Sequence, residues 1–364
     1  MGEIGEVRGE VDRRQRAEDP DDPGHPPEAE ASGRERVRRA HQRDHTAPDV
    51  HTAGIVTHTT SFGEAGFQMT TVTTTASRAL SGAVTGARRQ VGLVVRSRIA
   101  GDDAAAGRQR IWHSEGERWN DPGDAICRVN GDASMFAAGL TALLLQSLHP
   151  LAMAGVADHS DYRGDPWGRL QRTSGFIATT TFGTIADACD LIRTINGVHR
   201  SVVGVDHRGR PYDARDPHLL RWVHVAEIWS FLECHRLYGR ERLSPGLRDD
   251  YVRQSARTGL MLGARDVPTT ARELDRALEG YLPELESSPA ALDARHFILD
   301  EPPVGWTDKP VYTLLRHGAV AALPRWARGM LELPDGPRGS HRLGVVVGRT
   351  GVATLRWVLD AVDD

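Results

Sequence analysis

Two segments of the chain place their apolar residues at the period of an α-helix. In residues 185–203, apolar side chains recur every three or four positions and form one buried stripe, made of Ile185, Ala188, Ile192, Ile195 and Val202. In residues 217–238, leucine, tryptophan, valine and isoleucine are spread around nearly the whole circumference. A helix that is apolar on almost all sides is expected at the centre of a domain.

Signals for helix starts and stops extend this prediction along the chain from Ser134 onward. The starts combine a capping side chain with a proline at the first helical position, or with an acidic residue three positions later. They are Asp165-Pro166, Asp216-Pro217, Ser244-Pro245, Thr184-x-x-Asp187 and Thr270-x-x-Glu273. The glycines that are expected to end helices are Gly183, Gly204, Gly239 and Gly263.

The expected fold class is therefore all-α, a single helical bundle that spans residues 101–364. The predicted helices cover about 134–148, 166–182, 185–203, 217–238, 245–262, 271–281, 311–331 and 345–361. Alternating strand patterns are nearly absent, and only 343–347 and 205–212 are candidate strands.

The composition of the N-terminal region differs from that of the rest. Residues 1–50 contain 13 acidic residues, 9 arginines and no Phe, Trp or Tyr. Such a segment buries too little apolar surface to offset its ordering entropy, so we expect residues 1–68 to be a disordered leader. The alternative is that translation starts at Met69 and that 1–68 is a gene-model extension. Residues 69–100 are expected to form a linker and a first helix near 88–99.

Composition and charge exclude several classes of protein. A net charge of −4 gives no global argument for binding nucleic acid. Three widely spaced cysteines exclude a disulfide scaffold and a cysteine-built zinc site. The most apolar run, 136–157, is broken by Gln146, Ser147, His149 and Pro150, so it predicts a buried helix that ends at His149-Pro150. With no signal peptide recognisable, we expect a soluble, cytoplasmic protein.

His199 lies on the apolar stripe of the 185–203 helix, between Ile195 and Val202. A histidine on an apolar face is by default a core residue whose ring hydrogen-bonds to a backbone carbonyl. The alternative is a metal ligand that projects from an apolar surface from which water is excluded, as a proximal imidazole does toward a haem iron. The apolar stripe alone leaves both interpretations open.

The preceding helix, 166–182, carries a polar face. At 100° per residue, this face holds Arg169, Arg172, Thr173, Phe176 and Thr180. Two cations and two hydroxyls on a helix that looks buried favour an anionic or polar object opposite them, such as a haem propionate or a bound oxygen species. A solvated arginine face is the alternative.

A third cluster lies in the central helix, where His224, Glu227, Phe231 and His235 share one face. A glutamate three residues from a histidine resembles a di-metal carboxylate site, but no second motif in the right register accompanies it. Buried polar residues that satisfy one another are the simpler explanation. The chain also lacks GxSxG, GxGxxG after a strand, GxxxxGK[ST] and HExxH, which argues against the common hydrolases, dehydrogenases and kinases.

A series of short motifs in a fixed order resembles the catalytic domain of rubber oxygenase (latex-clearing protein) and MpaB-type oxygenases over about residues 115–340. The motifs are His149-Pro150, Gly155-Val156, His159-Ser160, Asp165-Pro166, Gly168-Arg169, Thr173, Phe182-Gly183, His199, Val203-Gly204, Tyr212, Asp216-Pro217, Trp222-Val223-His224, Leu243-Ser244 and Leu323-Pro324-x-Trp326. Each motif alone is weak, but their common order is fairly specific.

The resemblance implies a globin-like core that binds one b-type haem (haem b, iron) and uses dioxygen as co-substrate. Relatives of this kind cleave isoprenoid double bonds, so the implied partner is a hydrophobic small molecule, isoprenoid or otherwise unsaturated. No nucleic acid and no stable membrane insertion are expected. Rubber oxygenases use an upstream glutamate, whereas Met153 and Ala154 stand in the corresponding stretch here. A haem oxygenase is therefore a better expectation than a rubber-degrading enzyme.

The same resemblance assigns residues to roles. His199 matches the proximal ligand of the haem iron, and Arg169 and Thr173 match the family's Arg-x-x-x-Thr motif beside the haem. Arg172 stands where rubber oxygenases carry a distal lysine, so Arg169, Arg172 and Thr173 are the candidate catalytic residues. The candidate pocket residues are His159, Tyr162, Phe176 and His224.

Two alternatives to a haem oxygenase stay open. One is a haem-binding protein for sensing or storage that does not turn over a substrate. The other is a non-haem metalloenzyme whose metal is bound by His224, Glu227 and His235, or by His149 and His159.

Overall fold

The computed structural model describes residues 86, 88–93, 104–306, 308–333 and 340–363. The expected leader, 1–68, and most of the expected linker, 69–100, lie outside these residues, although 88–93 are helical where a first helix is expected. The described part is mostly helical, as predicted, and its two strands form one small hairpin. After the short α2 (Ala104–Arg108) and η1 (Gln109–His113), the helices α3 to α14 follow.

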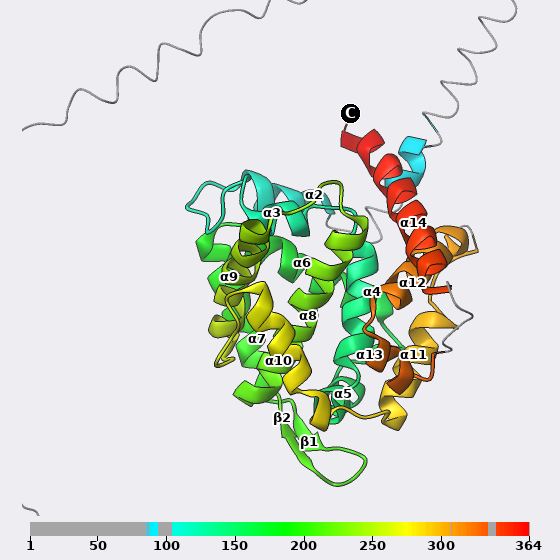
Figure 1. Cartoon of the computed structure of the whole chain (residues 1–364). Helices are drawn as coiled ribbons and strands as arrows, with labels where there is room; N and C mark the ends of the chain where they lie inside the picture. The colour runs from blue at the N-terminus through cyan, green and yellow to red at the C-terminus, as the bar shows by residue number, and fades with distance from the viewer. Residues whose placement is uncertain (1–85, 87, 94–103, 307, 334–339, 364) are drawn as a thin grey trace, which may run out of the picture. The chain divides into compact units, whose positions relative to one another are not determined.

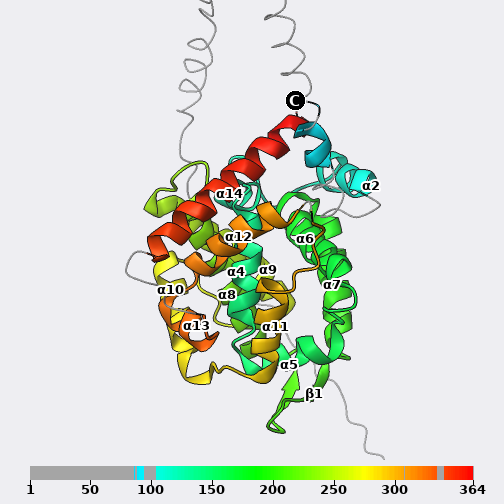
Figure 2. The same cartoon turned by 90° about the vertical axis from the view of Figure 1, so that its right-hand side faces the viewer.

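Four helices form the main packing unit. The central α8 (Pro217–Tyr238) packs along α4 (Met135–Gln146), and α4 also contacts α12 (Lys309–Ala322). The long α14 (Ser340–Asp363) covers α12, as Figures 1 and 2 show. The prediction that 217–238 lies at the centre is confirmed, because the core includes Leu219, Trp222, Val225, Ala226, Ile228, Phe231 and Leu232.

The other helices surround this unit. Helix α9 (Pro245–Leu262) packs on α3 (Ala125–Asn130), and α11 (Pro289–Leu299) packs on α5 (Pro150–His159). The other elements are α6 (Pro166–Phe182), α7 (Ile185–His199), α10 (Ala271–Gly280), η2 (Leu282–Glu284) and α13 (Arg325–Met330). The hairpin of β1 (Val203–Val205) and β2 (Pro211–Asp213) contacts α5 (Figures 1 and 2).

The predicted caps are present at the helix starts. The side chains of Asp165, Thr184, Asp216, Ser244 and Thr270 each accept a hydrogen bond from a backbone N–H in the first turn of the helix that follows. Three of the four predicted glycine stops are also helix ends, those at 183, 239 and 263. The helices that position the candidate site are therefore bounded by local signals in the sequence.

Other boundaries differ from the prediction. The helix expected at 185–203 ends at His199, because the chain turns there into the hairpin, and Gly204 lies in β1 rather than at a helix end. The candidate strand at 205–212 is confirmed as part of this hairpin, with Gly209 at a φ of 77° in its turn. The candidate strand at 343–347 is wrong, since these residues belong to α14 and pack against α12.

Two helices that begin at a proline, α5 and α11, are absent from the prediction. His149-Pro150 was expected to end a helix, and α4 does end before it, but Pro150 also begins α5. Pro289 begins α11, which was not predicted, after a cap by Ser288. The helix expected at 311–331 is divided into α12 and α13 at Leu323 and Pro324.

Among the described residues, no single helix has the length and apolar character needed to cross a bilayer. Helices α4 and α5 meet this requirement only when taken together, as a pair bent by 108°.

The close packing of α12 and α14 yields a test of the fold. A Cβ added at Gly348 would lie 2.4 Å from the Cα of Gly318 and 3.0 Å from the ring and hydroxyl of Tyr238. We therefore predict that Gly348→Ala lowers the free energy of unfolding by about 1–3 kcal/mol, the usual cost of overpacking. Gly139→Ala in α4 is the control, because open space surrounds that position. It should leave stability unchanged or raise it by about 0.5–1 kcal/mol. Equal effects of the two substitutions in urea unfolding would contradict this packing.

Candidate functional site

The residues predicted to surround a cofactor lie on α6 and α7, which are consecutive and in contact. Asp165 caps α6 and Pro166 is its first residue, while Gly183 ends it. The Thr184 hydroxyl then accepts from the N–H of Asp187 at 3.1 Å and starts α7. Two residues thus join a helix that carries Arg169 to a helix that ends at His199, and short connections of this kind make consecutive helices neighbours.

His199 has an imidazole nitrogen that lacks the partner expected of a core histidine. Its Nδ1 atom is buried and has no hydrogen-bond partner among the described residues. Desolvation lowers the pKa of the ring, so His199 is neutral at pH 7 and keeps a lone pair available. The simple explanation, a ring held by a backbone carbonyl through Nδ1, does not apply. A neutral, desolvated imidazole is the form that binds a metal ion.

Arg169 is a partly buried cation with no carboxylate partner in the described part of the chain. One Nη1–H donates to the hydroxyl of Ser160, at the end of α5. Burial, and to a smaller extent the charge of Arg172, lower the pKa of the guanidinium, although arginine stays charged near pH 7. A desolvated guanidinium bonded to a hydroxyl still has donors for an anion.

Arg172 is placed differently. Its side chain is 66% exposed, and its Nη1 lies 3.1 Å from Oδ2 of Asp165, the residue that caps α6. Thr173 is exposed as well, and its hydroxyl donates to the carbonyl of Arg169 at 3.0 Å. Phe176 is half-buried on the same helix. Of the two arginines on this face, Arg169 is the one whose charge is desolvated and unpaired.

His159 and Tyr162, predicted for the pocket, hold neighbouring segments together. Nε2 of His159 lies 3.1 Å from the hydroxyl of Tyr212, which donates to Asp158 at 2.7 Å and joins α5 to β2. The hydroxyl of Tyr162 donates to Asp293 on α11, whose carboxylate also pairs with Arg163. Through these contacts, His159 links α5 to β2 and Tyr162 links its loop to α11.

His224 and Glu227 form a second desolvated group, one turn apart on α8. Nε2 of His224 is buried without a hydrogen-bond partner among the described residues, and burial lowers the pKa of this ring to about 4. Burial alone raises the pKa of Glu227 to about 7. A Cβ at Gly259 would lie 2.9 Å from Cγ of His224, so α9 approaches α8 closely at this point.

The last turn of α9 also reaches α7. The side-chain amide of Asn196, one turn before His199, donates to the carbonyl of Met261 at 3.1 Å. The contact of Gly259 with His224 and that of Met261 with Asn196 therefore lie within one turn of α9. This arrangement connects the desolvated group on α8 with the helix that carries His199.

The set His224, Glu227 and His235, proposed from the sequence as metal ligands, is not among the groups of three ligands that lie close together in the described residues. His235 is buried next to Gly239 at the end of α8, away from the contact of His224 with α9. Within the described residues, the groups close enough to share an ion are His149, His218 and Glu284, and also Asp206, His207 and Glu286. Sequence reasoning included His149 but missed His218 and Glu284, because residues this far apart show no spacing signal.

The comparisons with known proteins agree with the resemblance. A family described as the ER-bound oxygenase mpaB/B' and rubber oxygenase catalytic domain matches residues 127–357, which contain α6, α7 and α8. No curated protein and no solved structure matches the chain significantly.

The raised pKa of Glu227 predicts a pH-dependent stability. A carboxyl with a raised pKa binds its proton more tightly in the folded state than in the unfolded state. The folded chain therefore loses stability as the pH rises from the unfolded pKa of Glu227, near 4.5, through about 7. Glu227→Gln, which is neutral at every pH, should therefore unfold like the wild type near pH 4, below the unfolded pKa. Near pH 8 it should be more stable by up to about 3 kcal/mol. The exposed Glu279→Gln is the control. A stability difference that is the same at pH 4 and pH 8 would contradict the desolvation of Glu227.

Proposed function

This chain belongs to the family of the ER-bound oxygenase mpaB/B' and rubber oxygenase catalytic domains, and on this premise we propose that it is a haem b-dependent oxygenase. Membership of an oxygenase family supports an oxidoreductase that uses dioxygen. The substrate that we propose is a hydrophobic small molecule, isoprenoid or otherwise unsaturated. The main observation in support of haem binding is the neutral imidazole of His199, whose Nδ1 atom is buried without a partner among the described residues.

The residues present fit a haem in two respects. His199, at the end of α7, offers a neutral ring as axial ligand, which is a common ligation in haem proteins. Arg169, on the neighbouring α6, offers a desolvated cation without a carboxylate partner, and this suits a propionate. Thr173, one turn after Arg169, supplies a hydroxyl on the same side of α6. The globin-like arrangement of helices around the haem is part of the same proposal.

A bound haem would supply dioxygen binding and the redox chemistry. The chain itself would orient the group through His199 and hold its charge through Arg169. Burial shifts His224 and Glu227 toward their uncharged forms, with pKa values of about 4 and about 7. Charges that develop where water is excluded interact more strongly with a fixed guanidinium than they do in water.

Exposed apolar side chains near α6 and α7 support a hydrophobic substrate. They are Leu170 on α6, Val198 on α7, and Val203 and Val205 on β1. Val198 precedes His199 directly, and β1 begins four residues after it. A substrate that contacts these side chains would be bound mainly by the burial of apolar surface, worth about 25 cal/mol per Å².

Turnover separates an oxygenase from a haem protein that only senses or stores. We expect the purified, haem-loaded chain to consume dioxygen in the presence of an isoprenoid alkene and to yield oxygenated products detectable by mass spectrometry. Haem binding with no dioxygen consumption across a panel of such alkenes would favour the non-catalytic alternative.

The proposed iron ligand, His199, can be tested by substitution. His199→Ala should lose bound haem, because it removes the residue proposed to bind the iron, and pyridine hemochromogen analysis of the purified variant measures the loss. Imidazole added to the variant should restore part of the haem absorbance by filling the space of the missing ring. His296→Ala, which removes an exposed histidine from α11, is the control and should keep the full haem content. Full haem retention by His199→Ala would refute the assignment.

The proposed role of the desolvated cation, Arg169, can be tested in the same way. Arg169→Gln should lower haem occupancy or dioxygen consumption without unfolding the chain, since it keeps a polar side chain but removes the charge. Arg193→Gln is the matched control, because Arg193 is exposed on α7 and pairs only with Asp190 among the described residues. Haem content, turnover and the circular dichroism spectrum are compared for both variants. Wild-type haem content together with wild-type turnover in Arg169→Gln would exclude a role for this charge.

A further inference from the structure

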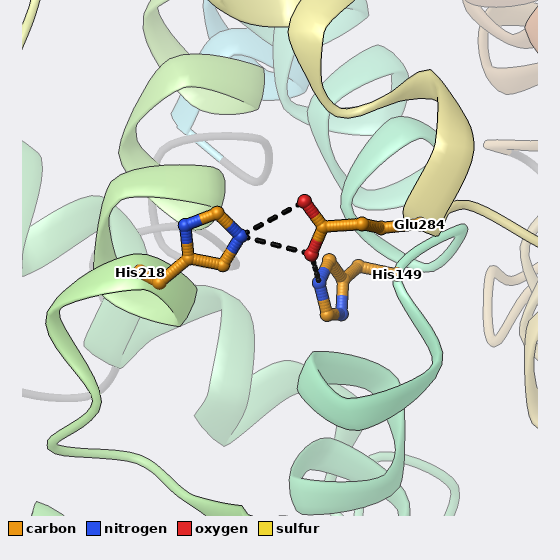
Figure 3. Close-up of side chains that lie close together, drawn as sticks. All are labelled: His149, His218 and Glu284. Atoms are coloured by element: carbon orange, nitrogen blue, oxygen red, sulfur yellow. Dashed lines mark hydrogen bonds and ion pairs between the residues drawn. The ribbon is translucent and has the colours of Figure 1, made fainter.

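A second cluster of potential ligands lies outside the candidate haem site, where three distant segments meet. His149 stands at the junction between α4 and α5, His218 is the second residue of α8, and Glu284 ends η2. Figure 3 shows both imidazoles directing a ring nitrogen at the same carboxylate. Asp216, which caps α8 through the N–H of His218, and Pro217 fix the place of His218.

The distances within this cluster are close to those of a coordination sphere. Nε2 of His218 lies 2.8 Å and 3.0 Å from the two carboxylate oxygens of Glu284, and Nε2 of His149 lies 3.5 Å from Oε2. All three ligand atoms lie within 4.8 Å of one another. Around a tetrahedral zinc ion with bonds of about 2.0–2.1 Å, neighbouring ligand atoms are about 3.3 Å apart. The separations of the two imidazoles from Glu284 differ from this value by about half an ångström or less.

His149 points into the cluster without making a hydrogen bond. Its side chain is 3% exposed, and neither ring nitrogen has a hydrogen-bond partner among the described residues. The 3.5 Å separation from Glu284 is too long for a strong hydrogen bond. The contact of His149 with the cluster is therefore a long ion pair with Glu284, and a metal ion would give its Nε2 a closer partner.

In the neighbouring cluster, arginines already pair with the carboxylates that could otherwise bind a metal ion. Asp206 and Glu286 lie near His207, but their oxygens are already occupied by arginine. Arg210 donates to Asp206 and to Glu286 at 2.7 Å and 2.8 Å, and Arg208 lies 3.0 Å from Glu286. Glu284, by contrast, forms its ion pairs in the described part of the chain with the two imidazoles alone.

We propose that His149, His218 and Glu284 bind a zinc ion. Two imidazoles and one carboxylate are ligands that zinc takes in proteins, and three protein ligands leave a fourth position for water. The side chains of His218 and Glu284 are 50% and 42% exposed, so this fourth position faces solvent. The site differs from the proposed haem site in its residues, in its metal and in its place in the fold.

Aromatic residues hold the site in position. The hydroxyl of Tyr281 donates to the carbonyl of His218 at 2.9 Å, and the Tyr281 ring lies 4.8 Å from the His218 ring. Trp222 packs on both Tyr281 and His149. The ion would therefore link the α4–α5 junction, the start of α8 and η2, and it should stabilise the folded chain over the unfolded one.

The test uses the full-length, haem-loaded chain after removal of zinc with a chelator. Zinc is titrated by calorimetry, and the zinc and iron contents are measured separately by mass spectrometry. We expect one zinc ion per chain and a melting temperature that rises with zinc. His218→Ala and Glu284→Gln, both at partly exposed positions, should weaken zinc binding by about 100-fold or more, beyond the usual effect of losing only an outer-shell partner.

His207→Ala and His296→Ala are matched controls. Each removes one imidazole that lies beside carboxylates, His207 in the neighbouring cluster and His296 between Asp300 and Glu301. Both should bind zinc like the wild type, and iron content should be the same in all variants. The proposal is overturned if the wild type binds no zinc, if His218→Ala and Glu284→Gln bind it like the wild type, or if His207→Ala abolishes binding.

Discussion

An imidazole nitrogen that is removed from water and given no hydrogen-bond partner costs the folded chain about 1–3 kcal/mol. This domain contains such nitrogens in His149, His199 and His224. Other buried side-chain atoms also lack a partner among the described residues, such as the hydroxyls of Ser134 and Tyr251 and the Nε atoms of Arg248 and Arg295. The histidines differ from these groups because a neutral imidazole nitrogen can bind a metal ion.

The helices that carry these histidines depend on local signals, which explains how well the sequence predicts them. Asp165-Pro166, Thr184 and Asp216-Pro217 start α6, α7 and α8 where the capping chemistry says they should. The boundaries that were wrong depend on tertiary structure. His199 ends α7 because the following residues pair as a hairpin against α5, and residues 343–347 are helical because α14 packs along α12. A pattern of apolar residues alone does not distinguish these outcomes.

The candidate site could be predicted in part. His199 and Arg169 were singled out from helical periodicity and from the resemblance to the oxygenase family, and the structure gives both a desolvated environment. Periodicity also placed Arg172 on the same face as Arg169, but only the structure shows that Arg172 is exposed and paired with Asp165. His218 and Glu284 could not be predicted, because their proximity to His149 arises from the packing of α5, α8 and η2.

Binding of haem through His199 is the proposal on which the assigned roles of the other residues in this oxygenase-family chain depend. It is tested by the ultraviolet–visible spectrum of the freshly purified full-length protein, expressed with ample haem, together with a pyridine hemochromogen assay. We expect a Soret band and one haem b per chain. A colourless protein with no haem under these conditions would refute the proposal.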